Sequence, residues 1–234
     1  MKKIGIIGAM SVEVELLRNE MNNVSTHKIG RLEFWDGVIG GVSVVVVKSG
    51  VGKVNAALCT QMLIDRFAVT HVINTGVAGA FASGLDVLDI VISTEVMYHD
   101  VDVTAWEGYE PCTLPGMEKT FVADSVLVDI GYKACEKCFP EKTFIKGRIA
   151  SGDQFIASDS LKKVIKEKCD PACVEMEGAA IGHVASLNNV PFLVIRSMSD
   201  KADDEGSEME PFNEEAAAKV SAVLVKEILK KKEN

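Results

Sequence analysis

The amino-acid sequence predicts an α/β fold in which a mainly parallel or mixed sheet carries helices on both faces. Short apolar, β-branched runs alternate with runs of helical period along the whole chain. No internal repeat, low-complexity segment or Pro/Gly/Ser-rich linker interrupts this alternation. A chain of 234 residues, 47% of them hydrophobic, is long enough to bury a full core. We therefore expect one domain over residues 1–234.

The elements of the first third follow from local patterns. Residues 3–8 form an apolar run that ends in glycine, which predicts a buried strand, and a helix should follow to Met21 with Ser11 as its N-cap. The β-rich runs 32–35 and 42–48 flank Gly37 and the Gly40-Gly41 pair, which predicts a hairpin. A helix over 53–67 and a strand over 71–75 come next.

The remaining elements continue the alternation. We predict strands over 89–96, 144–150, 173–176 and 192–197, and helices over 124–138, 160–166 and 178–187. The last helix, 213–232, places Val220, Leu224 and Ile228 on one face and carries its lysines at the C-terminal end, where they suit the helix dipole. Functional loops should lie at the strand ends, where ligands bind in open α/β sheets.

Charge and length exclude several classes of partner. The net charge of −9 disfavours nucleic acid and anionic membrane surfaces, because both are bound through Lys and Arg. The first apolar run meets Glu13 and Glu15 too soon for a signal peptide, and no run approaches the ~20 apolar residues that cross a bilayer. We expect a cytoplasmic protein without nucleic-acid or membrane partners, whose six cysteines form no disulfides.

Several apparent motifs fail on their spacing. The run 5–10 lacks the G-x-G-x-x-G pattern of dinucleotide sites, and Val54 replaces the magnesium-binding Ser or Thr of a P-loop after Gly52-Lys53. The closely spaced cysteines at 135 and 138 and at 169 and 173 have no histidine nearby in sequence. The four histidines are dispersed and form no nucleophilic triad. We expect neither a metal nor a cofactor.

Acidic residues follow three of the predicted strands. Glu13 lies in the first turn of the helix after the first strand, where the helix dipole alone would also favour an acid. Glu175 and Glu177 stand between an apolar strand and an Ala/Gly-rich helix, and Asp200 closes another apolar strand. Helix capping does not readily explain all three positions, which indicates a site at this edge of the sheet.

Seven stretches in the same order give the chain a family resemblance. They are residues 4–10 with Glu13, 48–53, 74–79, 98–104, 151–156, 174–177 and 196–200. Over essentially its whole length the chain resembles the bacterial methylthioadenosine/S-adenosylhomocysteine nucleosidases of the nucleoside phosphorylase superfamily. The resemblance implies a three-layer α/β/α fold with a central mixed sheet, a homodimer, and small-molecule adenine nucleosides as substrates.

The resemblance also implies catalytic roles. Cleavage of a ribose–adenine bond builds positive charge at the anomeric carbon, so the reaction needs an acid for the leaving group and a base for water. Asp200 matches the general acid to adenine N7, Glu13 the base that holds the water, and Glu177 the carboxylate that binds the ribose hydroxyls. Arg196 either positions the water and the acids or is a structural ion-pair partner.

The implied binding residues are mostly apolar. Phe155 should stack on adenine, with Ile156 and Ser199 at its edge, and Met176 should lie under the ribose. The remaining matches are the stretch with Ala78 and Gly79, the tail-pocket residues Met10, Val51 and Phe212, and the partner-subunit loop with Val103, Trp106 and Pro115. For each apolar residue taken alone, ordinary core packing is the better explanation, by roughly two to one. Val77 and Trp106 depart from the residues common in the family.

Other functions of the same fold stay open. A purine nucleoside phosphorylase would use phosphate in place of water, but Ala9, Met10 and Glu13 predict an apolar, acidic lining that repels a dianion. A hydrolase of another modified purine nucleoside, such as futalosine, would keep Glu177 and Asp200 and differ in the tail pocket. A nucleoside-binding protein without activity would not need all three acids.

Overall fold

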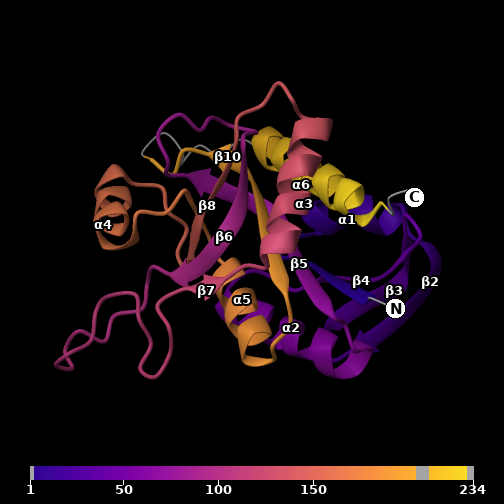
Figure 1. Ribbon diagram of the computed structural model, residues 1–234, viewed down its shortest axis with the longest axis horizontal. Coiled ribbons are helices and arrows are strands. Elements are labelled where there is room, and N and C mark those ends of the chain that lie inside the picture. The colour runs from indigo at the N-terminus through magenta and orange to yellow at the C-terminus, as the bar shows by residue number, and fades with distance from the viewer. Residues whose placement is uncertain (1–2, 204–210, 231–234) are drawn as a thin grey trace.

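The computed structural model describes residues 3–203 and 211–230 and has the expected three-layer architecture (Figure 1). In chain order the strands are β1 (Lys3–Gly8), β2 (Asn22–Ile29), β3 (Leu32–Ile39), β4 (Val42–Lys48), β5 (His71–Ala80), β6 (Ile90–Tyr98), β7 (Phe121–Val122), β8 (Phe144–Ser151), β9 (Cys173–Glu175) and β10 (Phe192–Asp200). The helices are α1 (Ser11–Asn19), α2 (Lys53–Phe67), α3 (Ser125–Cys138), α4 (Asp159–Cys169), α5 (Gly178–Leu187) and α6 (Pro211–Leu229).

The described strands form one mixed sheet in the order β10-β6-β8-β9-β5-β1-β4-β3-β2, with β7 beside β6. Strand β10 also pairs with β5, so the strands from β10 to β5 close on themselves while β1 to β2 extend the sheet on one side. The β1–β4, β1–β5, β5–β10, β6–β8 and β8–β9 pairs are parallel. The carboxyl ends of these parallel strands therefore meet at one edge.

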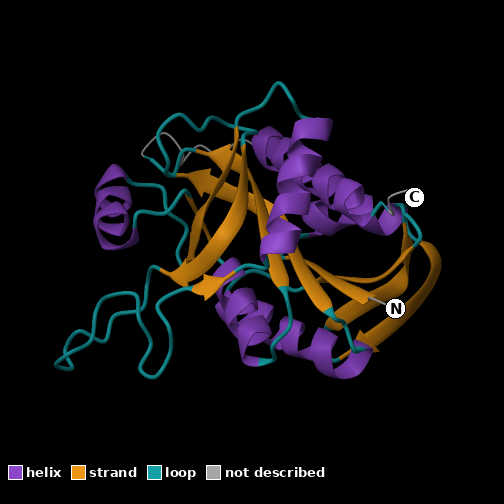
Figure 2. Ribbon diagram, in the orientation of Figure 1, coloured by secondary structure: helices purple, strands orange, loops and turns teal. Residues whose placement is uncertain are grey.

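Helices cover both faces of the sheet, as Figure 2 shows. Helix α6 packs on α1 and α3 and against β5 and β10, while α2 and α5 pack on each other on the opposite side. Helix α4 lies apart from the other helices, at the left in Figure 1, on the side of the molecule that carries β8. None of the described helices is both long and apolar enough to cross a membrane.

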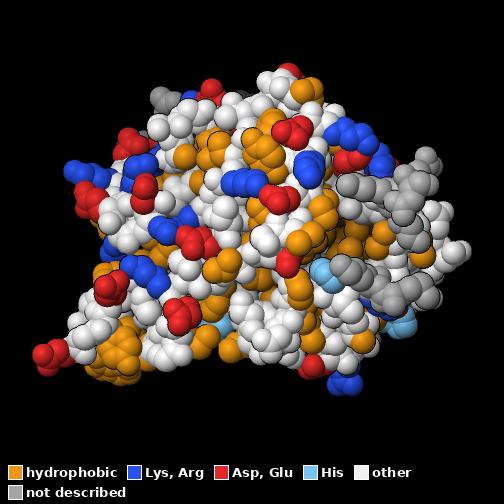
Figure 3. Space-filling view, in the orientation of Figure 1, with side chains coloured by type: hydrophobic (Ala, Val, Ile, Leu, Met, Phe, Trp, Pro, Cys, Tyr) orange, Lys and Arg blue, Asp and Glu red, His pale blue; other side chains and the backbone are white. Residues whose placement is uncertain are grey.

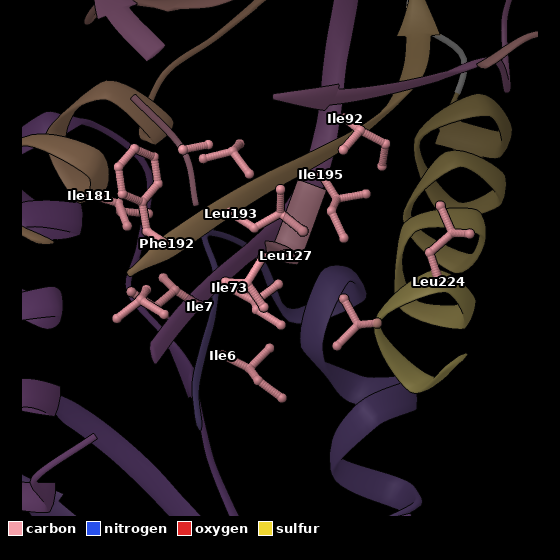
Figure 4. Close-up of a cluster of buried hydrophobic side chains, with 14 of the residues drawn as sticks. Ile6, Ile7, Ile73, Ile92, Leu127, Ile181, Phe192, Leu193, Ile195 and Leu224 are labelled. Carbon is pink, nitrogen blue, oxygen red and sulfur yellow. The ribbon is translucent and has the colours of Figure 1, made fainter. Parts of the chain in front are cut away.

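The core lies between the central strands and these helices (Figure 4). Ile6, Ile73, Ile92 and Leu193 are completely buried there. All nine residues of β10 are buried, because strands covered on both faces have no solvent-facing side. The polar residues at the end of β10 are therefore held in a dry environment next to the core.

The structure corrects three details of the expected elements. Helix α1 begins at Ser11 but its N-cap is Met10, since the Glu13 carboxylate reaches back to accept from the Met10 backbone N–H. Strand β2 has no counterpart in the sequence prediction, because its side chains are polar and nearly all exposed. Its backbone is held by antiparallel pairing with β3. Strand β5 continues five residues beyond the predicted end at residue 75, to Ala80.

The long connection between β6 and β7, residues 99–120, projects from the body of the protein (Figure 1). Trp106 and Tyr109 on it are 61% and 39% exposed and contact each other edge to face. In the space-filling view an apolar group protrudes at the place of this loop, at the lower left (Figure 3). A loop with its large aromatic side chains in solvent is typical of a surface that another molecule covers.

Candidate active site

A cavity opens where the parallel strands end, with a volume of about 140 Å³. Its walls come from segments far apart in sequence that the sheet topology brings together. The described residues lining it are Ala9, Met10, Glu13, Val51, Val77, Ala78, Gly79, Gln154, Phe155, Ile156, Val174, Glu175, Met176, Glu177, Ser199 and Asp200.

Glu13 enters the cavity from the first turn of α1 and is almost completely buried. Its Oε2 accepts hydrogen bonds from the backbone N–H groups of Ala9 and Met10 at 2.6 and 2.9 Å, and its Oε1 accepts from the Val77 N–H at 3.2 Å. Burial raises the pKa of Glu13 above its ordinary value, and Arg196 and these N–H groups offset that only in part. A carboxylate has about four acceptor positions, so one on Oε1 is left for a ligand or water.

Beneath the cavity, Arg196 forms a buried ion pair with Glu175. The guanidinium also donates to Asn74 Oδ1 at 2.5 Å and to the Ile195 carbonyl at 3.0 Å. Burial by itself would raise the pKa of Glu175, but Arg196 and the Ser151 hydroxyl hold it below its ordinary value. Arg196 does not line the cavity, so the ion-pair alternative from the sequence describes its contacts.

Glu177 lies at the N-cap of α5 with 6% of its surface exposed. Its Oε1 accepts the Gly52 backbone N–H at 2.7 Å. Burial, with Glu175 nearby, raises the pKa of Glu177 to about 8, against the influence of Arg196 and the Gly52 N–H. Among the described residues none donates to Oε2 of Glu177, which leaves that oxygen for a ligand.

Asp200, at the end of β10, is 7% exposed and held by two donors. Its Oδ2 accepts from the Ser199 hydroxyl at 2.8 Å, and its Oδ1 accepts from the Ala202 N–H at 2.8 Å. The side chain is thus fixed at the cavity wall.

Two glycines of β5 let these acids approach the sheet. A Cβ on Gly76 would lie 2.5 Å from Glu13 Oε1, and a Cβ on Gly79 would lie 2.9 Å from Asp200 Oδ1. Both distances are below any normal contact, so the positions of Glu13 and Asp200 require glycine at these points of the strand.

The structure brings most of the predicted site residues together. Glu13, Glu177, Asp200, Met10, Val51, Ala78, Gly79, Phe155, Ile156, Met176 and Ser199 all line the cavity. Val103, Trp106 and Pro115 lie on the projecting loop and do not line it. The side chain of Phe212 lies outside the described residues. The roles of all these residues stay predictions.

Sequence reasoning missed several parts of this site. Glu175 was noted only as an acid at a strand end, and Asn74, Ser151, Gln154 and Val174 were not singled out for a role. The blocks 74–79, 151–156 and 174–177 contain all five of them, so the resemblance held a signal for them. The buried Arg196–Glu175 pair joins two strands and could be found only from their arrangement.

The described part of the chain contains no cluster of His, Cys, Asp and Glu suited to a metal ion. All six cysteines are free thiols.

Comparison with known proteins agrees over the whole fold. A model of the phosphorylase superfamily matches residues 3–230. The 5'-methylthioadenosine/S-adenosylhomocysteine nucleosidase of Tolumonas auensis is 44% identical over 225 residues, 95% of this chain and 97% of that one. The crystal structure of the Neisseria meningitidis nucleosidase with methylthio-immucillin-A has a TM-score of 0.95 and 39% identity, covering 98% and 99% of the two chains. The futalosine hydrolase of Helicobacter pylori superposes with a TM-score of 0.91 at 30% identity, covering 97% of each chain.

Proposed function

Because this chain belongs to the phosphorylase superfamily, and within it to the 5'-methylthioadenosine/S-adenosylhomocysteine nucleosidase family, we propose that it hydrolyses the N-glycosidic bond of those two nucleosides. The products are adenine with methylthioribose or S-ribosylhomocysteine. The observation that carries the proposal is the convergence of Glu13, Glu177 and Asp200 on one mainly apolar cavity.

Asp200 is the general acid in this proposal. When protonated it donates to adenine N7, so that the purine leaves without a negative charge. Two donors, Ser199 Oγ and the Ala202 N–H, fix its carboxyl group at the cavity wall. Phe155, with its ring 55% exposed, is free to stack on the adenine ring.

Glu13 is the base that activates water. Three backbone N–H groups fix both of its oxygens, and the remaining acceptor position on Oε1 takes a proton from the water. Burial raises its pKa, which makes it a better base near neutral pH than an exposed carboxylate.

Glu177 binds the ribose hydroxyls and stabilises the cationic transition state. Its Oε1 is held by the Gly52 N–H, and Oε2 accepts from no donor among the described residues, so it is available to the ribose hydroxyls. A negative charge that forms in this dry site attracts a developing positive charge more strongly than it would in water. Glu175 accepts the Glu177 backbone N–H at 3.0 Å and is paired with Arg196. Arg196 does not line the cavity, so it helps to position Glu177 without touching the substrate.

The lining favours water over phosphate as the nucleophile. Phosphorolysis requires cationic or multiple N–H donors for a dianion, and the described cavity lining contains no Lys, Arg or His. Four acidic side chains, Glu13, Glu175, Glu177 and Asp200, line the same volume, and their negative charge would repel phosphate.

We propose that the 5' substituent of the substrate occupies the apolar part of the cavity beside Met10 and Val51, and that the projecting loop of a second subunit closes it. Support for a homodimer comes from apolar side chains in solvent, Val54 at 78% and Leu58 at 51% on α2 and Trp106 at 61% on the projecting loop. Sedimentation of the purified chain should give twice its mass of 25.2 kDa. A monomer at micromolar concentration would contradict this part of the proposal.

Futalosine is the second candidate substrate, because the Helicobacter pylori hydrolase shares the fold at 30% identity. It presents the same ribosidic bond with a different 5' group and base, so the acids would act alike. The tail end of the cavity decides between the substrates.

The proposal is tested by incubating purified protein with methylthioadenosine, with and without phosphate, and separating the products by chromatography. Adenine and free methylthioribose should form at the same rate in both samples. Strict dependence on phosphate would contradict hydrolysis. Parallel reactions with S-adenosylhomocysteine and futalosine rank the substrates by kcat/KM.

A further inference from the structure

Outside the cavity lining, three loops are tied together by one ion-pair cluster, formed by Lys53, Asp100 and Asp153. Lys53 Nζ donates to Asp100 Oδ2 at 2.5 Å and lies 3.7 Å from Asp153 Oδ2. The Lys53 backbone N–H donates to Asp153 Oδ1 at 2.8 Å, and the Asp153 N–H donates to Asp100 Oδ2 at 2.9 Å. The Lys53 cluster therefore joins the turns after β4, β6 and β8 in a closed set of contacts.

Two of these turns carry groups of the candidate active site. The residue before Lys53 is Gly52, whose N–H donates to Glu177, and the residues after Asp153 are Gln154, Phe155 and Ile156 of the cavity wall. Contacts of the cluster thus lie one residue away from the hydrogen bond that holds Glu177.

The backbone conformation of Gly52 depends on a contact from another loop. Its φ of 98° and ψ of 160° lie in a region that only glycine adopts readily, and as N-cap of α2 it has no side chain to bind the helix N-terminus. Asp153 from the β8 loop supplies that contact instead. A Cβ on Gly52 would lie 3.1 Å from Asp153 Oδ1, so the two turns are in close contact.

The cluster is shielded enough to act as a fixed support. The side chains of Lys53 and Asp100 are 22% and 14% exposed, and the Lys53 ammonium lies 5.4 Å from the Tyr98 ring centroid. Although burial acts against it, the hydrogen bond from Lys53 holds the pKa of Asp100 below its ordinary value, so the pair stays ionised at neutral pH.

We propose that Lys53 is a positioning residue for the proposed nucleosidase reaction: through Asp100 and Asp153 it holds the Gly52 N–H on Glu177. The hydrogen bond fixes Glu177 for the ribose and favours its ionised form. This inference rests on the proposed function for its catalytic consequence, but the contact itself can be tested without turnover.

The test measures the titration of Glu177 in protein labelled with ¹³C at the glutamate carboxyl groups, with the signal assigned from Glu177→Gln. The other charged groups that face Glu177 are Glu175 on β9, Arg196 on β10 and Glu13 on α1, and none of them is changed. In Lys53→Met the titration midpoint should rise by about one pH unit, because a hydrogen bond to a carboxylate is lost. Lys53→Arg should restore the wild-type midpoint.

Lys3→Met is the matched control, since Lys3 forms a comparable ion pair with Asp36 at 2.6 Å. Lys3 lies at the amino end of β1, whereas the cavity lies at the carboxyl ends of the strands. It should leave the Glu177 midpoint unchanged. An unchanged midpoint in folded Lys53→Met would overturn the proposal, as would an equal rise in Lys3→Met. If Lys53→Met does not fold, Asp100→Asn removes the charge pair at constant volume and should raise the midpoint in the same direction.

The pH profile of kcat/KM for methylthioadenosine gives the catalytic consequence. The part of this profile that rises as Glu177 ionises should move to higher pH in Lys53→Met, by the same amount as the NMR midpoint. Absence of turnover by the wild type would contradict the proposed function while the NMR titration still decides the role of Lys53.

Discussion

Replacing Arg196 with methionine removes the positive charge that balances the buried acids while keeping a long side chain. Arg196 is 1% exposed, and its loss deprives Glu175, Asn74 and the Ile195 carbonyl of their donor. Breaking a buried ion pair from one side costs about 3–5 kcal/mol, because the other charge is left uncompensated. We therefore expect the free energy of unfolding of Arg196→Met to fall by about 4 kcal/mol at pH 7.

The loss of unfolding free energy in Arg196→Met should depend on pH in a defined direction. In the wild type the pKa of Glu175 is held below its ordinary value of 4.5, so the pair stabilises the fold above that pH and the stabilisation is lost as the pH falls. Without Arg196 the pKa of Glu175 is raised by burial, so the variant loses stability as the pH rises. The difference between the two proteins should therefore narrow below about pH 4.5.

Urea unfolding followed by the fluorescence of Trp35, which is buried, measures both effects. Arg148→Met is the control, because the Arg148–Glu95 pair is partly exposed and should contribute less than about 1 kcal/mol. Arg196→Met combined with Glu175→Gln should be more stable than Arg196→Met alone. A single variant within about 1 kcal/mol of wild type would refute the reasoning that Arg196 compensates a buried charge.

Four other changes separate catalysis, binding and stability. Asp200→Asn should lower kcat by about 10²- to 10⁴-fold, because the amide cannot protonate adenine N7, and a near-normal kcat would remove Asp200 from the role of acid. Burial raises the pKa of Glu177 to about 8, so the wild type loses stability as the pH rises from the ordinary value of 4.5 toward 8, because the carboxyl group ionises more readily in the unfolded chain. The Tm of Glu177→Gln should therefore rise relative to that of wild type between pH 5.5 and 8.5. A difference in Tm that stays constant over this range would be the contrary result. Phe155→Ala should weaken adenine binding about 2- to 10-fold in calorimetry through lost stacking, with Tm nearly unchanged because the ring is half exposed. Gly76→Ala should abolish turnover, since its Cβ would lie 2.5 Å from Glu13 Oε1, and an active variant would show that Glu13 can move without loss.

The contrast between β10 and β2 shows which elements local patterns can predict. Strand β10 is buried along its whole length, and its first four residues, 192–195, form a continuous apolar run that stands out without any knowledge of its neighbours. Strand β2 is polar and solvent-exposed, and only backbone pairing with β3 keeps it extended. Pairing between backbones leaves little trace in side-chain composition, which is why β2 was missed.

Local patterns likewise predict some features of the candidate site and not others. Glu13, Glu177 and Asp200 could be found because each follows an apolar strand, and the carboxyl ends of parallel strands meet at one edge. Their chemical states could not be found in this way. The pKa of Glu177 depends on burial and on Glu175, and its Gly52 contact joins residues 125 positions apart.

By itself, the sequence determined the alternating α/β order, the acids at the strand ends and the family blocks, because periodicity, turn residues and residue type are local properties. The tertiary structure decided which strands are neighbours, and with them the Arg196–Glu175 pair, the approach of Gly76 to Glu13 and the Lys53 cluster. These contacts depend on distances of a few ångströms between residues far apart in the chain. Electrostatic and steric energies change steeply over such distances, so only the folded arrangement sets them.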